Sequence, residues 1–138
     1  MDAAGLNSGL MMPQYSAASL VLENQTLATP DSVHSLPTSG EQEDHNANAM
    51  TAARHARQIV DNTTHVLAIE LYSAARAVDL RLRQYPNGRL GVGTQAALDA
   101  IRKEVPYQAG DALWGPEIEA IQQMIRQKRI STSFDTRP

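Results

Sequence analysis

Apolar residues recur at helical spacing along most of this chain, and the breaks in the pattern fall at Pro and Gly. Over residues 13–28 the apolar positions lie three and four residues apart, which predicts a helix that Pro13 opens and Pro30 ends. Residues 47–85 contain neither Pro nor Gly and are rich in alanine. They predict one very long helix, or two in line, of about 55 Å at 1.5 Å per residue.

Two shorter helices are expected after the long one. A Pro-Asn-Gly turn at residues 86–88 ends the long helix. Thr94 is expected to cap a helix over residues 95–105, and Pro116 is expected to open a last helix over residues 117–128. The pattern therefore predicts an all-α fold with one long central helix and shorter helices beside it.

The middle of the long helix, residues 66–75, is apolar on nearly every side. A helix that is apolar all round has to be covered all round, and the other expected helices are few and short. We therefore expect the covering neighbours to come from another subunit or from a further part of the protein, so that this chain forms part of a multi-subunit helical bundle.

Composition and charge narrow the classes of function. The 138 residues have the length of one domain, with 42% hydrophobic but only 4% aromatic residues, so aliphatic side chains must form the core. A net charge of −3 provides no basic surface for nucleic acid or an anionic membrane. There is no cysteine, no apolar run of roughly 18 residues and no basic region at the N-terminus, so we expect a cytoplasmic protein without a signal peptide.

Residues 29–46 have the composition of a loop, with Pro, Ser, Thr and Gly in close succession. A loop of this length inside a compact domain is usually functional or disordered, and we expect it to be of the active-site type. The polar residues 131–138 are expected to form a flexible tail.

Within that loop, residues 42–45 read Gln-Glu-Asp-His and admit two interpretations. In the simpler one, Asp44 or Asn46 caps the long helix and the other side chains are solvated. In the other, the segment is a polar clamp for an amino acid, because Glu43 can accept from an ammonium or imidazole N–H while Gln42 both donates and accepts. The pattern alone leaves both open.

Other candidate residues have structural interpretations. The four histidines form neither an H-E-x-x-H motif nor a pair four residues apart, so no metal site is predicted. Glu70 lies among apolar residues and is expected to be buried and paired with Arg76 or Arg81 rather than to act as a base. Met11 is a core residue or lines an adaptable pocket.

Several of these segments together resemble the C-terminal part of the aromatic amino-acid ammonia-lyase family, and within it the histidine ammonia-lyase branch. The resemblance runs in collinear order over nearly all of residues 1–138. The segments that carry it are Gly-Leu-Asn-Ser-Gly-Leu-Met-Met-Pro-Gln at 5–14, Pro-Thr-Ser at 37–39, Gln-Glu-Asp-His at 42–45 and Ile-Glu-Leu at 69–71. Gly40 and Glu41 stand where the family usually has Ala-Asn before the Gln-Glu-Asp-His block.

The resemblance implies an all-α homotetramer whose active sites are shared between subunits. It implies loss of ammonia from an α-amino acid to give an α,β-unsaturated acid such as urocanate. The electrophile in that family is a methylidene-imidazolone made from an internal Ala-Ser-Gly, which belongs to an N-terminal part that this chain lacks. We therefore expect an N-terminal lyase polypeptide as partner, and we interpret the likeness of Thr38-Ser39-Gly40 to the cyclising tripeptide as coincidental.

Carried over by position, the resemblance implies that Glu43 contacts the substrate's imidazole or amine as the catalytic residue. It places Gln42 in the hydrogen-bond network of the substrate site and Met11 in the side-chain pocket. A carboxylate at Glu43 favours histidine, with tyrosine or phenylalanine as alternative substrates, and elimination could continue to a β-amino acid. The alternative from a different class is a non-catalytic helical remnant or oligomerisation module.

Overall fold

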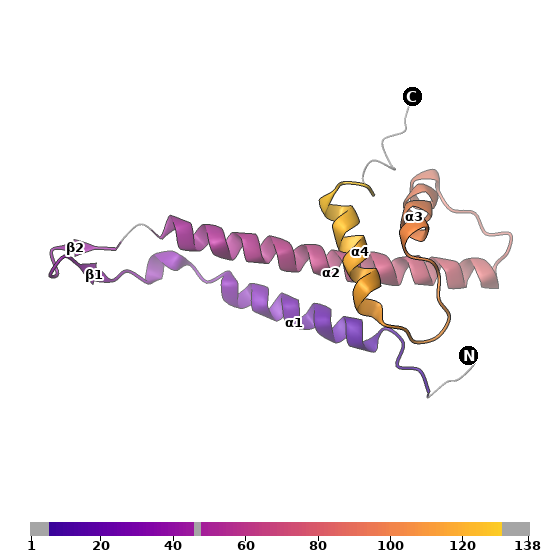
Figure 1. Ribbon diagram of the computed structural model, residues 1–138, viewed down its shortest axis with the longest axis horizontal. Helices are drawn as coiled ribbons and strands as arrows, with labels where there is room; N and C mark the ends of the chain where they lie inside the picture. Colours follow the sequence, from indigo (N-terminus) through magenta and orange to yellow (C-terminus); the bar gives the residue numbers. More distant parts are fainter. Residues whose placement is uncertain (1–5, 46–47, 131–138) are drawn as a thin grey trace, which may run out of the picture.

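A computed structural model describes residues 6–45 and 48–130 of the chain. Nearly all regular structure in this part is helical, which confirms the all-α fold class (Figure 1). None of the described helices combines the length and apolar character needed to cross a membrane. The elements are α1 (Met11–Leu27), η1 (Asp31–Val33), β1 (Pro37–Thr38), β2 (Glu43–Asp44), α2 (Ala49–Gln84), α3 (Val92–Glu104) and α4 (Trp114–Arg126).

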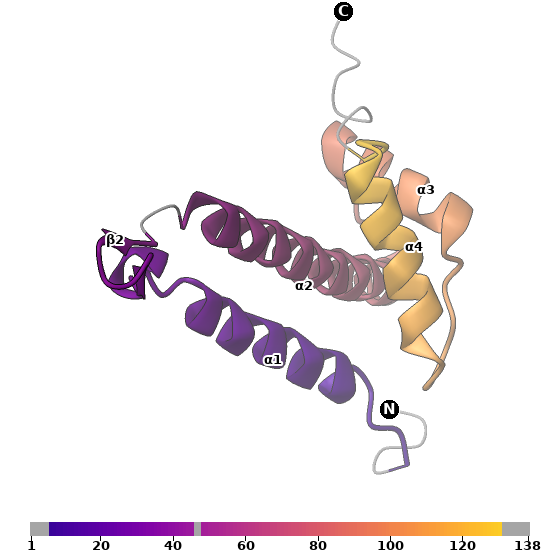
Figure 2. The ribbon, with the colours of Figure 1, turned by 60° about the vertical axis from the view of Figure 1, so that its left-hand side comes forward.

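The long helix forms without a break, so the alternative of two helices in line is wrong. α2 has 36 residues and is therefore about 54 Å long. α1 runs antiparallel beside its first half, and α4 crosses α2 near its middle (Figures 1 and 2). α1 therefore follows α2 from its start to its middle, and the C-terminal helices pack on α2 from its middle towards its end.

The hydrophobic core lies where α2, α3 and α4 meet. On α2, Ala68, Tyr72 and Ala75 recur at helical spacing and are buried. α4 places Ile118 and Ile121 against them, and Ala68 and Ile121 are both 0% exposed. Only Pro13 is buried on α1, so this helix is attached less by apolar burial than the C-terminal helices are.

α1 is instead joined to α2 by a polar network. Asn62 is 4% exposed, and its amide nitrogen donates to Glu23 Oε2 at 2.8 Å and to Asn24 Oδ1 at 2.9 Å. Gln58 donates to the amide oxygen of Asn62 at 2.9 Å. Because a buried amide must find partners, this network fixes the register of α1 on α2.

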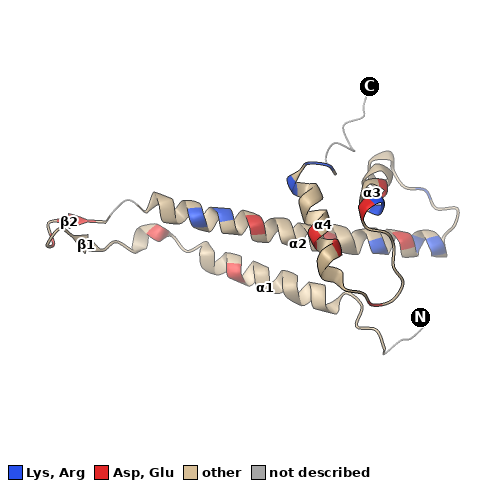
Figure 3. Ribbon diagram, viewed as in Figure 1, with Lys and Arg blue, Asp and Glu red and all other residues tan. Residues whose placement is uncertain are grey.

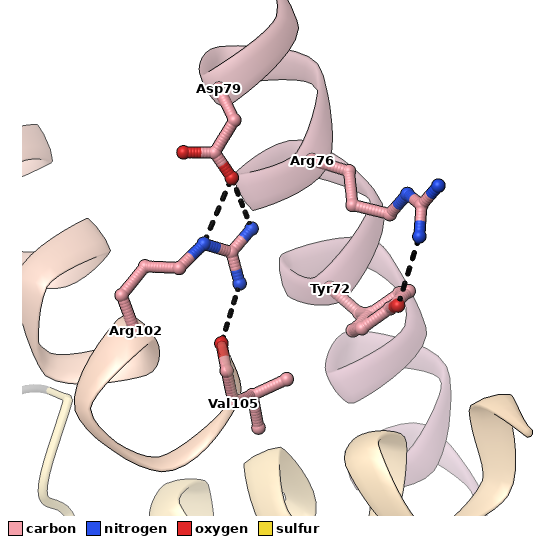
Figure 4. Close-up of polar contacts among 5 residues, drawn as sticks. All are labelled: Tyr72, Arg76, Asp79, Arg102 and Val105. Carbon is pink, nitrogen blue, oxygen red and sulfur yellow. Dashed lines mark hydrogen bonds and ion pairs between the residues drawn. The ribbon is translucent and has the colours of Figure 1, made fainter. Parts of the chain in front are cut away.

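An ion pair ties the end of α3 to α2 (Figure 4). Arg102 Nε donates to Asp79 Oδ2 at 2.9 Å, and a second guanidinium nitrogen contacts the same oxygen. Arg102 Nη1 donates to the carbonyl of Val105 at 2.9 Å, which also satisfies the chain just beyond α3. Both charged side chains are largely buried, at 17% and 18% exposure.

The helix starts differ from the predicted ones. α3 begins at Val92 after Gly91 without a side-chain cap, so the prediction of Thr94 as cap is wrong. α4 begins at Trp114, which places Pro116 inside its first turn, where an unpaired N–H makes Pro tolerable.

The residue before α2 differs from both caps expected for the long helix. The residue that precedes α2 is Asn48, without a side-chain cap, so Asp44 is not the cap. Asn46, the other expected cap, and the tail 131–138 lie outside the described residues.

The apolar stretch 66–75 is covered on one side within this chain. Ile69 and its neighbours on the α4 side are buried, whereas Leu67 on the other side remains 43% exposed. Glu70 is also exposed, so the prediction of a buried, paired Glu70 is wrong for the single chain. The physical reason is that α4 crosses α2 on one side only, and Arg76 and Arg81 contact aromatic rings instead.

Candidate functional site

The polar segment forms a short β-hairpin rather than an irregular loop. β1 and β2 pair antiparallel, with Pro37 opposite Asp44 and Thr38 opposite Glu43. Ser39, Gly40 and Glu41 at the turn have φ values of 51°, 66° and 68°. Left-handed residues reverse the chain tightly, which brings the family-like residues 37–39 and 42–45 side by side.

Glu43 points back towards the turn of the hairpin. Its carboxylate accepts from the Ser39 hydroxyl at 3.2 Å, and its carbonyl accepts from Thr38 Oγ1 at 3.2 Å. The amide of His45 donates to the carbonyl of Leu36 at 2.8 Å and closes the hairpin. Glu43 and Gln42 are both exposed in the chain, so their functional groups are open to a ligand or to another polypeptide.

Asp31 fastens the base of this loop to α2. Its carboxylate lies 3.3 Å from His55 Nδ1, and its carbonyl accepts from the side chain of Asn48 at 3.1 Å. The long loop is therefore held at its start by the first turns of α2. No sequence pattern predicts this pair, because Asp31 and His55 are separated by a segment without periodicity.

Met11 lies at a different place, at the first residue of α1. Its side chain is 49% exposed and lines an open cleft between the start of α1 and the middle of α2. The cleft is lined from α1 by Leu10, Met11, Gln14 and Ala17 and from α2 by Val66, Ile69, Glu70 and Ser73. Glu70 is thus a charged group at an otherwise mostly apolar cleft.

One chain does not bring the three predicted site residues together. Met11 begins α1, whereas Gln42 and Glu43 follow beyond its other end, and α1 has 17 residues, or about 25 Å. In Figure 1 the hairpin lies at one extremity of the molecule and the start of α1 lies near the middle of α2. The two groups therefore face different regions of space.

Arg76 organises a group of aromatic residues near the start of α1. Its guanidinium lies 4.8 Å from the ring centroid of Trp114 and 5.7 Å from that of Tyr107. It also donates to Tyr72 Oη at 3.3 Å (Figure 4) and to the carbonyl of Gly110 at 3.1 Å. The loop between α3 and α4 is therefore anchored on α2.

The pKa of Tyr72, at the centre of this group, is raised. Burial raises the pKa of its phenol above the ordinary value of 10.0, and a hydrogen bond with Glu117 raises it further, while Arg76 opposes the shift. The phenol is therefore a stable donor at neutral pH. Sequence reasoning missed this group, whose only signal was that three of the few aromatic residues of the chain belong to it.

Charge elsewhere is spread along the helices (Figure 3). α1 is nearly uncharged, with Glu23 as its one charged residue. Across the part of the chain that the structure describes, no three His, Asp or Glu side chains converge as a metal site would require.

Comparison with known proteins gives concordant results. The family model for "Aromatic amino acid lyase" matches residues 1–103. Histidine ammonia-lyase from Symbiobacterium thermophilum is 48% identical over 131 residues, covering 95% of this chain and 25% of the relative. Histidine ammonia-lyase from Chloroflexus aurantiacus strain J-10-fl is 43% identical over 132 residues, with the same coverage of 95% and 25%.

Solved structures of similar proteins are consistent with the sequence comparison. Histidine ammonia-lyase from Trypanosoma cruzi superposes with a TM-score of 0.86 at 29% identity over 97% of this chain and 26% of that one. Tyrosine aminomutase from Streptomyces globisporus superposes with a TM-score of 0.81 at 32% identity over 94% and 24%. The chain thus spans about a quarter of the length of the relatives it matches, which share both its sequence pattern and its helical arrangement. It belongs to the aromatic amino acid lyase family.

Proposed function

We propose that this chain is the C-terminal segment or subunit of a histidine-type ammonia-lyase, which converts L-histidine into urocanate and ammonia. The observation that carries the proposal is the identity of 43% to 48% with histidine ammonia-lyases over 95% of the chain. The segments that suggested the family, including the hairpin with Gln42 and Glu43, lie inside that matched region.

The chain's own residues bind and orient the substrate. Glu43 is a carboxylate on a short rigid turn and accepts a hydrogen bond from an imidazole N–H or from the amine. Gln42 beside it donates and accepts, which allows it to connect the substrate to other polar groups. Met11 supplies a polarisable apolar wall for the ring.

The separation of Met11 from the hairpin supports a site built from several copies of the chain. Since α1 spans about 25 Å, one copy contributes Met11 to one chamber and Glu43 to another. An assembly of the tetramer type brings both ends together at each chamber. It also covers the α2 side on which Leu67 remains exposed.

The electrophile belongs to another polypeptide segment. The sequence contains no Ala-Ser-Gly, and Thr38-Ser39-Gly40 is used for the hairpin turn. When present, a methylidene-imidazolone supplies the electron sink that makes the amine a better leaving group. The residues of this chain do not replace it, because a clamp that binds substrate and transition state equally does not accelerate the reaction.

The direct test is to incubate the purified chain with L-histidine and follow urocanate absorbance, with and without a lyase polypeptide that carries Ala-Ser-Gly. Urocanate is expected only when both are present. Activity of the chain by itself would contradict the proposed division of roles, and inactivity of the mixture with histidine, tyrosine and phenylalanine alike would contradict the proposed function.

Two alternatives have specific support. The likeness to a tyrosine aminomutase favours tyrosine as a second candidate substrate, with a β-amino acid as product. The exposed apolar residues of α1, such as Tyr15 at 66% and Leu22 at 63%, suit a helical module that only assembles. Product analysis with each amino acid distinguishes the first alternative, and an inactive but fully assembled complex favours the second.

A further inference from the structure

The start of α1 is held by a residue from the far end of the chain. Asp111 Oδ2 accepts from the Ser8 amide at 2.7 Å, and Asp111 Oδ1 accepts from the Gly9 amide at 2.9 Å. Gly9 has a φ of +58°, a left-handed conformation that L side chains rarely adopt. Two successive N–H groups near such a residue converge on one anion, and here that anion is a carboxylate of the protein.

These two bonds lie outside the helix and fix the turn that leads into α1. α1 has no side-chain cap at Leu10 and no acidic residue in its first turn. The amides of Ser8 and Gly9, which lie in the turn before Leu10, are instead held from residue 111, more than a hundred residues away in sequence. Met11 follows Gly9 by two residues, so its position depends on this contact.

Asp111 is itself positioned from the core. The preceding residue, Gly110, accepts from Arg76, whose guanidinium also stacks on Trp114. Arg76 contacts the phenol of Tyr72, which is 2% exposed. A continuous chain of contacts thus runs from the core of α2 through the loop between α3 and α4 to Ser8 and Gly9, just before Met11.

We propose that Asp111 is a positioning residue for the substrate pocket, because it holds the Ser8–Gly9 amides and thereby sets where Met11 stands. This inference rests on the proposed function only in so far as Met11 lines a substrate pocket. A pocket wall on an exposed helix start is useful only if that start is immobilised, and Asp111 does so without occupying the cleft that Met11 lines.

The contact is tested on the full chain by methionine methyl NMR and amide exchange. In Asp111→Ala the Met11 methyl resonance is expected to move, and exchange at Ser8 and Gly9 is expected to accelerate by roughly 10- to 100-fold. Asp111→Asn keeps one acceptor oxygen and should give a smaller change of the same kind. Unchanged exchange and an unmoved Met11 resonance in Asp111→Ala would overturn the inference.

Two internal controls separate positioning from unfolding. Met124 is 1% exposed in the core and Met50 lies on the first turn of α2, so neither resonance should move in Asp111→Ala. Asp99→Ala removes a carboxylate that accepts from Gln95 on the same helix, α3, and it should leave Met11 unchanged. A shift of the Met124 resonance would show that Asp111→Ala unfolds the chain. The Met11 resonance of the milder Asp111→Asn variant then tests the role of Asp111.

Kinetics on the assembled enzyme test the functional consequence. Asp111→Ala and Met11→Ala are each expected to raise KM for histidine by roughly tenfold with little change in kcat, because an apolar pocket wall contributes to binding. The KM of the double variant should be no higher than that of either single variant. If the two increases in KM multiply instead, Asp111 does not act through Met11 and the inference is overturned. If even the unmodified assembly makes no urocanate, the proposed function fails, and the Met11 resonance still decides the role of Asp111.

Discussion

Glu43 and Gln42 stand on a turn whose backbone leaves little freedom. Three consecutive residues with positive φ and the Ser39 hydroxyl fix the direction of the Glu43 carboxylate. The sequence suggested these side chains as a clamp, and their exposure in the chain leaves that role a prediction. A fixed carboxylate in an enclosed chamber is worth more than a mobile one in water, because its orientation is set before the substrate binds.

Replacing Glu43 tests the clamp. Glu43→Gln in the assembled enzyme is expected to lower kcat/KM for histidine by about 10- to 100-fold, since a hydrogen bond to a charged group is lost. Glu41→Gln, two residues away on the same turn, is the matched control and should change the rate little. Equal losses in both variants would show that general charge, rather than the Glu43 contact, is responsible.

Tyr72 predicts a pH dependence at the alkaline end. Because its pKa is raised in the folded chain, the stability that it contributes is complete below the unfolded value of about 10 and is lost as pH rises through the higher folded value. The free energy of unfolding should therefore fall above pH 10, and Tyr72→Phe should flatten that fall. Denaturant titrations across alkaline pH measure both, and identical slopes would contradict the assignment.

At the scale of elements, the long helix was predictable and the hairpin was not. α2 follows from a long stretch without Pro or Gly, because helix propensity is informative when it is summed over many residues. β1 and β2 have two residues each and consist of Pro, Thr, Glu and Asp, so no alternation marks them. Only the turn residues Ser39 and Gly40 carried a local signal.

The contacts between elements were the least predictable part. The hydrogen bonds between Asp111 and Ser8 and between Arg76 and Gly110 join residues that no periodicity or motif connects in the sequence. The core of α2 and α4 could be anticipated from apolar spacing, but which side of residues 66–75 is covered depends on where α4 crosses. Sequence patterns state what each helix can bury, whereas the crossing geometry decides what it does bury.

The Arg102–Asp79 ion pair should determine how firmly α3 is attached. Arg102→Ala leaves a largely buried carboxylate without its partner, and we expect a loss of about 3 kcal/mol in the free energy of unfolding. Asp61→Asn breaks the exposed pair with Arg126, where both side chains are over 40% exposed, and should cost less than about 1 kcal/mol. Chemical denaturation measures both, and similar losses would contradict the burial argument.

At the scale of the whole molecule, the chain is elongated (Figure 1), and its core lies where α3 and α4 pack on α2. α1 exposes Tyr15, Val21 and Leu22, and α2 exposes Val60 and Leu67. Apolar surface distributed along two long helices favours association with other helices.

Association should therefore be measurable in solution. The chain of 15.0 kDa is expected to sediment as a multimer or as a complex with its lyase partner. Leu67→Asp should reduce the assembled mass, because it places a charge in the proposed interface. Val92→Asp at the exposed start of α3 serves as the control, and a monodisperse monomer for the unmodified chain would contradict the assembly.

The antiparallel return of α1 has a genetic consequence. If each copy contributes Met11 to one active site and Glu43 to another, a substitution at Met11 and a substitution at Glu43 inactivate different active sites. Co-expressing Met11→Asp with Glu43→Ala should then restore activity by interallelic complementation, because some chambers in a mixed oligomer receive both intact contributions. Placing both changes on the same polypeptide and mixing it with an unaltered copy would distinguish cis from trans arrangement by the number of working chambers that remain.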